Sequence, residues 1–276
     1  MCYNGETLDV GGFSMKIGFF DSGIGGLTVL YEAMTRFSQH EFIYYADSDH
    51  APYGPQPKSL VRSYIFEAVA FLVSQQVDAI VIACNTATSV AISDLREQYE
   101  IPIIGMEPAV KPALEVESDR SRVLVTATPL TVKEEKLAQL ISRLNSSEVV
   151  DLVALPQLVS FAEQFDFSDA TIISYLRESF EGIAIGDYKA VVMGCTHFPL
   201  FTPQYRQIFG KTVVFIDGSH GTINRLADVL QLEELKDIEL RQRPYVTYYR
   251  SGVVANEQEV MQYERILAKL AMIKTC

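Results

Sequence analysis

The sequence predicts an α/β protein with two similar lobes, each a mainly parallel sheet flanked by helices, and an active site in the cleft between them. Short apolar runs alternate with longer amphipathic stretches, which is the pattern of β-α-β units. Two matched segments, 79–86 (AIVIACNT) and 190–197 (AVVMGCTH), each end an apolar run on a cysteine. Because open α/β sheets bind ligands at the carboxyl ends of their strands, we expect Cys84 and Cys195 to lie at a functional edge.

The apolar runs predict eight strands, and the stretches between them predict helices. Ser59 to Gln75 and Pro129 to Arg143 carry apolar residues at helical spacing. Thr202-Pro203 is typical of a helix N-cap followed by proline at the first helical position. The predicted strands are Lys16–Phe20, Phe42–Ala46, Ala79–Ile82, Ile103–Gly105, Arg122–Val125, Val149–Val153, Ala190–Met193 and Val213–Ile216.

The two cysteine segments predict the division into lobes, with one thiol in each. Residues 16–107, together with a returning segment 217–276, form the first predicted lobe, and residues 108–216 form the second. Residues 1–14 contain acidic residues, no lysine or arginine and no long apolar core, so they are predicted to be a loose leader rather than a signal peptide. Met15 is an alternative start.

Composition excludes several classes of protein. With 276 residues, of which 48% are hydrophobic, the chain can bury one large or two medium cores. The net charge of −12 and the lack of a basic cluster argue against a nucleic acid or an anionic membrane as a partner. No apolar run approaches a membrane span. The four cysteines form no Cys-x-x-Cys pair, which indicates a reducing compartment, and we expect the cytoplasm.

Either cysteine alone is most simply a buried, inert hydrophobic residue. The repetition changes that interpretation, because the same strand-end position is followed by Asn85-Thr86 in one copy and by Thr196-His197 in the other. His197 lies two residues beyond Cys195, on the same side of the strand end, and can tune that thiol. The pair therefore favours a functional site with two thiols.

Three further segments follow predicted strands, and each has a structural and a functional interpretation. The glycine-rich turn from Asp21 to Thr28 is either a tight strand-to-helix turn or an anion cradle, and Asp21 is placed to orient an acid or base. The rigid loop from Ala51 to Pro55 either packs Tyr53 or presents its hydroxyl to a ligand. Thr128 and Thr131 either cap a helix or bind an anion at its start.

Five motifs in this order resemble those of the glutamate racemases of bacterial cell-wall synthesis, over most of residues 16–217. One departure is Thr128-Pro129-Leu130-Thr131, where members of the family often carry Thr-x-Gly-Thr. The motifs are Asp21-Ser22-Gly23-Ile24-Gly25-Gly26, Pro52-Tyr53-Gly54, Cys84-Asn85-Thr86-Ala87-Thr88, Pro108-Ala109-Val110-Lys111-Pro112-Ala113 and Gly194-Cys195-Thr196-His197-Phe198-Pro199-Leu200.

The resemblance implies a racemase without a cofactor or a metal, acting on L- and D-glutamate between two lobes and assembling as a homodimer. It makes Cys84 and Cys195 the catalytic thiols, with Asp21 and His197 as their auxiliary acid/base partners. The substrate-binding positions that it implies are Ser22, Tyr53, Gly54, Asn85, Thr86, Thr128, Thr131 and Thr196.

Racemisation needs one group to remove the α-proton and another to deliver a proton to the opposite face. A free thiol has a pKa of about 8.5, so we expect helix-start amides and His197 to lower the pKa of the attacking cysteine. Racemisation of aspartate or another amino acid remains an alternative. A further alternative is a metal-binding or redox protein that uses Cys84, Cys195 and His197, although structural zinc sites usually show closely spaced ligand pairs.

Overall fold

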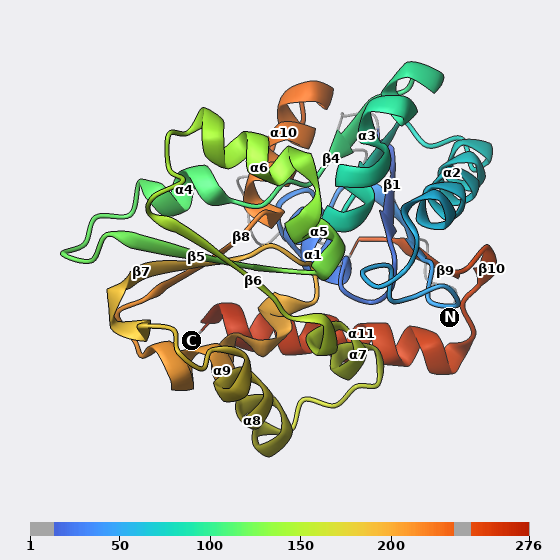
Figure 1. The fold of residues 1–276 in the computed structure, drawn as a ribbon. Coiled ribbons are helices and arrows are strands. Elements are labelled where there is room, and N and C mark those ends of the chain that lie inside the picture. Colours follow the sequence, from blue (N-terminus) through green and yellow to red (C-terminus); the bar gives the residue numbers. More distant parts are fainter. Residues whose placement is uncertain (1–13, 235–243, 276) are drawn as a thin grey trace.

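The structure is a computed structural model that describes residues 14–234 and 244–275. Within these residues the chain forms a six-stranded and a four-stranded sheet (Figure 1). The α/β class expected from the sequence is confirmed, and each of the eight predicted strands is present within two residues of its predicted bounds. The predicted leader, apart from Ser14, lies outside the described residues. The strands are β1 (Lys16–Asp21), β2 (Glu41–Ala46), β3 (Ala79–Ile82), β4 (Ile103–Gly105), β5 (Arg122–Ala127), β6 (Val150–Ala154), β7 (Tyr188–Met193), β8 (Val214–Asp217), β9 (Val246–Arg250) and β10 (Val253–Val254).

The first sheet has the strand order β10-β9-β2-β1-β3-β4. Every neighbouring pair is parallel except β9 and β10, which are antiparallel. The inner strands are nearly continuous apolar runs because helices cover both faces of the sheet. The pair β9–β10 lies in the returning segment 217–276, where the sequence analysis placed no strand.

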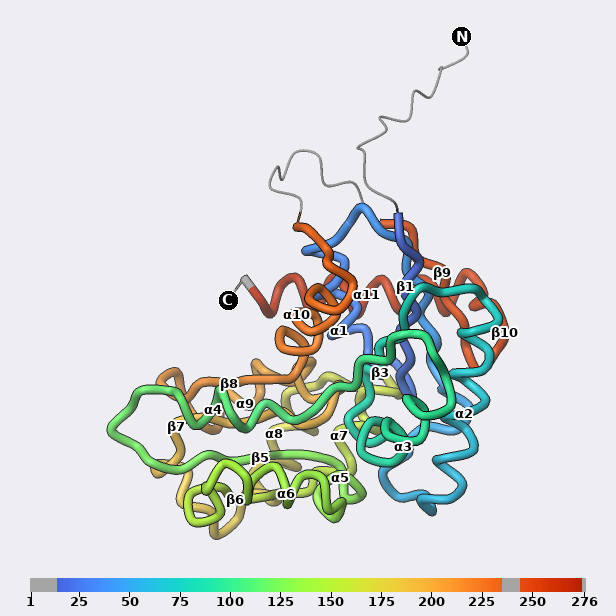
Figure 2. The backbone as a smooth tube through the Cα atoms, turned by 90° about the horizontal axis from the view of Figure 1, so that it is seen from above, coloured from blue at the N-terminus to red at the C-terminus, as the bar shows by residue number. Residues whose placement is uncertain are grey.

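The second sheet has the order β6-β5-β7-β8, and all its pairs are parallel. Its central strands β5 and β7 are almost entirely buried. Seen from above, the strands of the two sheets run in different directions, and the chain passes between them after β4 and after β8 (Figure 2). Each cysteine therefore follows a buried strand of a different sheet.

The helices include two short 3-10 turns and differ from the predictions at two places. The predicted helix 129–143 is interrupted at Glu134, whose backbone is extended (φ −72°, ψ 134°). Thr202 was predicted to be an N-cap but is the first helical residue, and its hydroxyl donates to the carbonyl of Pro199 (2.7 Å). The helices are α1 (Leu27–Arg36), α2 (Lys58–Ser74), α3 (Asn85–Gln98), α4 (Val110–Leu114), α5 (Pro129–Lys133), α6 (Glu135–Arg143), α7 (Pro156–Glu163), α8 (Asp169–Ser179), η1 (Ile185–Asp187), η2 (Phe198–Phe201), α9 (Thr202–Phe209), α10 (Ser219–Leu230) and α11 (Glu257–Thr275).

The largest apolar core joins the two sheets. It includes Phe19 and Val81 of the first sheet and Val191 and Met193 of the second, all less than 4% exposed. Helix α11 runs beneath both sheets in the view of Figure 1 and contacts both α1 and η2. Burial of this shared core holds the two strand-end edges against each other.

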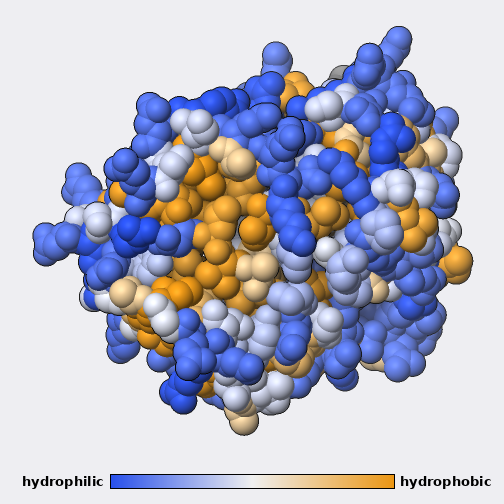
Figure 3. All heavy atoms as spheres, in the orientation of Figure 1, coloured by the Kyte–Doolittle hydropathy of each residue, from blue (hydrophilic) through white to orange (hydrophobic). Residues whose placement is uncertain are grey.

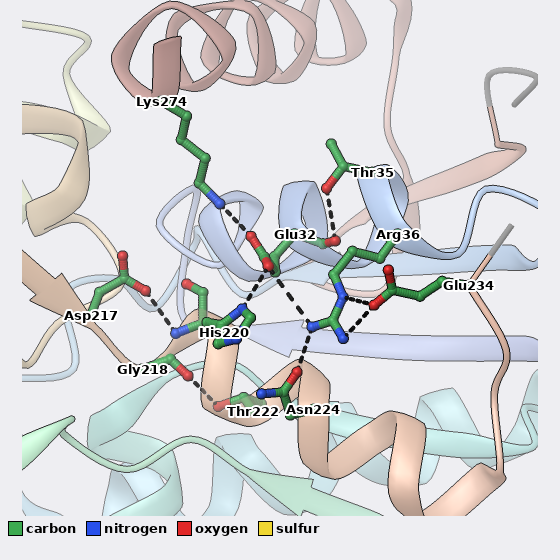
Figure 4. A network of polar contacts seen from close by, with 11 residues as sticks. Glu32, Thr35, Arg36, Asp217, Gly218, His220, Thr222, Asn224, Glu234 and Lys274 are labelled. Carbon is green, nitrogen blue, oxygen red and sulfur yellow. Dashed lines mark hydrogen bonds and ion pairs between the residues drawn. The ribbon is translucent and has the colours of Figure 1, made fainter. Parts of the chain in front are cut away.

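A polar network fastens α10 and α11 to α1 (Figure 4). Glu32 of α1 accepts hydrogen bonds from His220 of α10 (3.1 Å) and from Lys274 of α11. Arg36 of α1 donates to Asn224 of α10 (2.7 Å). These contacts link three helices that lie far apart in the sequence. No helix in the described part of the chain is long and apolar enough to cross a membrane.

Candidate active site

Cys84 lies between the end of β3 and the start of α3. Its sulfur caps the helix by accepting a hydrogen bond from the amide of Ala87 (3.4 Å), and its thiol faces the hydroxyl of Ser22 (3.7 Å). The side chain is only 5% exposed. Burial, together with the nearby charge of Asp21, raises the pKa of the Cys84 thiol to about 12, which outweighs the lowering by the Ala87 amide. The helix-start amide of Ala87 therefore lowers the pKa of Cys84 as expected, but burial and Asp21 raise it by more.

Cys195 occupies the matching position after β7, but its surroundings differ. Its sulfur lies 3.7 Å from Nδ1 of His197, and the opposite ring nitrogen, Nε2, lies 2.6 Å from a carboxylate oxygen of Glu163. Burial alone lowers the pKa of His197, yet its hydrogen bonds to Cys195 and Glu163 raise that pKa well above its usual value. A cationic imidazole thus stands beside Cys195 but not beside Cys84.

Asp21 connects the two halves from the first sheet. One of its carboxylate oxygens accepts a hydrogen bond from the hydroxyl of Thr196 (3.0 Å), and the other accepts from the amide of Gly23 (3.0 Å). Burial raises the pKa of Asp21 to about 6, against a partial lowering by His197. Near neutral pH this carboxyl is therefore close to the point where it gains or loses a proton.

The glycine-rich turn brings the second sheet close rather than cradling an anion. A Cβ added at Gly25 would lie 2.3 Å from Nδ1 of His197, and one added at Gly23 would lie 1.8 Å from Glu163. The amide of Ile24 is also occupied, since it donates to Glu163 (2.8 Å). These contacts favour the structural interpretation of the segment as a tight strand-to-helix turn. Its glycines lie where another part of the chain packs against the backbone.

Three threonine hydroxyls join the two halves on another side. Thr86 at the start of α3 lies 2.9 Å from Thr128 and 3.1 Å from Thr131, measured between hydroxyl oxygens. The Thr128 hydroxyl also accepts from the amide of Thr131 (3.2 Å), so Thr128 caps α5 as the sequence allowed.

Asn85 is buried, and its side-chain amide has no hydrogen-bond partner among the described residues. Buried amides are nearly always paired in folded proteins. The unpaired group therefore points to a polar ligand at this position.

Tyr53 and Gly54 form the wall next to Cys84. Tyr53 packs its ring near Phe20 (6.5 Å between ring centroids), while its hydroxyl donates to Asp47 (2.5 Å). The hydroxyl is therefore engaged within the protein, and what Tyr53 offers to a ligand is its ring and backbone. A Cβ on Gly54 would lie 3.1 Å from that of Thr128, so the loop closely approaches the second sheet.

The two thiols line one cavity of about 10 Å³, which is space for about one water molecule. Asp21 and Thr131 do not line this cavity but contact residues that do. Asp21 accepts a hydrogen bond from Thr196, and the Thr131 hydroxyl lies against that of Thr86. The other sequence-predicted site residues line it directly. They are Ser22, Tyr53, Gly54, Cys84, Asn85, Thr86, Thr128, Cys195, Thr196 and His197.

Sequence reasoning missed Glu163, Val159 and Asp47. Val159 lines the same cavity from α7, and Glu163 ends that helix. Glu163 also lines a larger adjoining cavity of about 650 Å³. No motif marks the two α7 residues, because only the packing of α7 against the glycine turn brings them to the site. Asp47 carried a usable signal, since it follows β2 directly.

Comparison with known proteins places the chain in a family. The sequence profile of the Asp/Glu/Hydantoin racemase family matches residues 29–226. The chain belongs to this family. It is therefore a racemase, as the resemblance implied. Among curated relatives, glutamate racemase 2 of Bacillus subtilis (strain 168) is 48% identical over 254 residues, which is 91% of this chain and 95% of the relative.

Another curated relative and a solved structure are also glutamate racemases. The glutamate racemase of Campylobacter concisus (strain 13826) is 44% identical over 262 residues, covering 94% of this chain and 99% of the relative. The crystal structure of Escherichia coli glutamate racemase in complex with L-glutamate and the activator UDP-MurNAc-ala superimposes with a TM-score of 0.77 at 26% identity, covering 93% of this chain and 95% of that one. The similarity thus extends over both sheets.

Proposed function

We propose that this racemase interconverts L- and D-glutamate by proton transfer between two cysteines, Cys84 and Cys195. The observation that carries the proposal is that two buried free thiols, from the ends of two different sheets, line one cavity. The substrate is inferred from relatives up to 49% identical that are glutamate racemases.

In the proposed reaction one sulfur, as thiolate, takes the α-proton from one face of the amino acid. The other sulfur, as thiol, gives its proton to the opposite face of the carbanion. After the reaction the first cysteine is a thiol and the second is a thiolate. The high pKa of Cys84 suits the protonated partner, and His197 stabilises negative charge that develops on the sulfur of Cys195.

The substrate carboxylates are proposed to bind to neutral groups. Among the residues that line the cavity there are serine and threonine hydroxyls and the unpaired amide of Asn85, but no arginine. Neutral groups stabilise the carboxylates of the bound substrate less than an arginine would. More of the electrostatic stabilisation is then specific to the carbanion. Because the cavity holds only about 10 Å³, substrate binding requires the site to widen.

The test is α-proton exchange in heavy water, followed by NMR with each enantiomer of glutamate. We expect deuterium to enter both enantiomers without an added cofactor, and Cys84→Ser or Cys195→Ser to abolish racemisation. Turnover of aspartate faster than glutamate would overturn the proposed substrate. Activity that chelation removes would overturn the two-thiol chemistry, although the described residues contain no cluster of three metal-ligating side chains.

Several wider assignments belong to the same proposal. We propose the cytoplasm as the compartment, since both thiols are free and must stay reduced. The division into residues 16–107 with 217–276 and residues 108–216 is supported by the separate sheets. We further propose that the product D-glutamate serves peptidoglycan synthesis. Rescue of a bacterium that requires D-glutamate would test this role.

A homodimer is proposed on the same resemblance. Figure 3 shows apolar residues gathered over the part of the surface where β5, β6 and β8 lie in Figure 1. Leu152 of β6 and Val214 of β8 are 37% and 40% exposed. A large exposed apolar surface is typical of an interface. Light scattering of the wild type and of Leu152→Asp would test whether the protein is a dimer and whether this surface forms it.

A further inference from the structure

Asp47 is a buried carboxylate that the proposed proton transfer does not use. It follows β2 directly and is 2% exposed. Its oxygens accept hydrogen bonds from the Tyr53 hydroxyl (2.5 Å) and the Ser251 hydroxyl (3.1 Å), and they lie 2.9 and 3.0 Å from Nδ1 of His50. Tyr53 lines the thiol cavity, whereas Ser251 lies about 200 residues away in the sequence, at the turn between β9 and β10.

The β9–β10 turn is fastened to the segment around Asp47 at three points. The amide of Ser251 donates to the carbonyl of Ala46 (2.8 Å), and its hydroxyl accepts from the amide of Asp49 (3.1 Å). Arg250 forms an ion pair with Asp49 (2.6 Å). Ser251 adopts φ 44°, a left-handed conformation that is uncommon for serine. The surrounding contacts therefore hold this turn in one conformation.

The Tyr53 hydroxyl donates to Asp47 and is therefore not free to bind the substrate. The Tyr53 ring lies 6.5 Å from Phe20 and 6.2 Å from Tyr64, measured between centroids, so the aromatic neighbours set its plane. The hydrogen bond to Asp47 then fixes its position within that plane. Gly54, the next residue, lies against Thr128 across the cavity. A shift of Tyr53 would consequently move the wall that faces Cys84.

We propose that Asp47 and Ser251 are positioning residues, which hold Tyr53 and Gly54 in place for the substrate. The C-terminal β9–β10 turn then contributes to the site, although neither of its strands reaches the cavity. The inference rests on the proposed function, because it assigns substrate affinity to a contact outside the cavity lining. Loss of a hydrogen bond to a charged group lowers the affinity about 10-fold.

The experiment is a double-mutant cycle on glutamate racemisation with Asp47→Asn and Tyr53→Phe. Each single variant should raise KM about 10-fold while kcat changes less than about 3-fold, because the contact orders the wall and does not touch the reacting atoms. If Asp47 acts through the Tyr53 hydroxyl, Asp47→Asn should change KM little in the Tyr53→Phe background. Asp94→Asn is the matched control, since the Asp94 carboxylate forms an exposed ion pair with Arg62 on a different part of the structure, and its KM should equal that of the wild type.

Three outcomes decide the inference. Effects of Asp47→Asn and Tyr53→Phe that multiply, or a loss of kcat at unchanged KM, would overturn it. Should Asp47→Asn fail to fold, Ser251→Ala enters the same cycle, with an expected rise in KM of about 3-fold that disappears with Tyr53→Phe. Wild-type protein without glutamate turnover would instead refute the proposed function, so the two failures are distinguishable.

Discussion

The two halves of the candidate site share a strand-end cysteine but differ in what surrounds it. Cys84 is placed by a helix amide and the Ser22 hydroxyl, and burial keeps its pKa high. Cys195 is placed next to His197, which Glu163 helps to keep cationic. Equivalent backbone positions thus produce unequal thiols, because the residues after each strand recruit different partners. This inequality suits a reaction that needs an acid and a base at the same time.

The largest expected effect comes from removing either sulfur. Cys84→Ser and Cys195→Ser should each lower kcat/KM about 10²- to 10⁴-fold, since serine is far less acidic than cysteine. Both directions of the reaction should lose activity equally, because both sulfurs act in each direction. Circular dichroism of each glutamate enantiomer measures this loss. A variant that keeps wild-type racemisation would show that its sulfur transfers no proton.

Asp21→Asn tests the Cys84 half through stability. The folded pKa of Asp21 is about 6 against a normal value of 3.8. The stability that this shift contributes is present below pH 3.8 and is lost as pH rises through about 6. Relative to wild type, Asp21→Asn should therefore gain about 2–3 kcal/mol between pH 4 and pH 8, measured by urea denaturation at both pH values. A difference that does not change with pH would contradict the raised pKa.

The same variant tests the charge that Asp21 places near Cys84. Since that charge contributes to the high pKa of the thiol, Asp21→Asn should lower the pKa of Cys84. Iodoacetamide should then alkylate Cys84 faster at pH 8 than in the wild type. Peptide mass spectrometry resolves the alkylation of Cys84 in the wild type and in the variant, and equal rates would contradict the prediction.

Glu163→Gln tests the Cys195 half. Because Glu163 raises the pKa of His197, its replacement should lower that pKa and move the alkaline limb of the activity profile to lower pH. We expect a loss in kcat/KM of about 10-fold at pH 8 and a smaller one at pH 6. Gln164→Ala, at the next residue, is the control and should match the wild type. An unchanged pH profile would show that Glu163 only connects α7 to the Ile24 amide.

The smallest expected effect is that of Ser22→Ala. The contact between the Ser22 hydroxyl and the Cys84 thiol is long, 3.7 Å, and its loss should lower kcat/KM about 3- to 5-fold. Steady-state kinetics with both enantiomers measures it. A loss as large as that of Cys84→Ser would mean that Ser22 holds the substrate or carries a proton itself.

Much of the site was predictable because its residues follow apolar strands directly. Asp21, Cys84 and Cys195 each come at or just after a buried run, and parallel sheets gather such positions at one edge. Tyr53 and Gly54 of the loop after β2 line the cavity, but only the folded chain shows that the Tyr53 hydroxyl donates to Asp47. Glu163 could not be found in this way, because it lies at the end of α7, a helix that carries no motif.

By itself the sequence determined the α/β class and the eight main strands, because apolar periodicity is a local property of the chain, and its five motifs indicated the family by resemblance. Only the tertiary structure decided how Cys84 and Cys195 differ. The pKa of Cys84 depends on burial and on Asp21 from β1, and the raised pKa of His197 beside Cys195 depends in part on Glu163 from α7. It also decided that the β9–β10 turn closes against Asp47, since hydrogen bonds between distant segments leave no periodic pattern in the sequence.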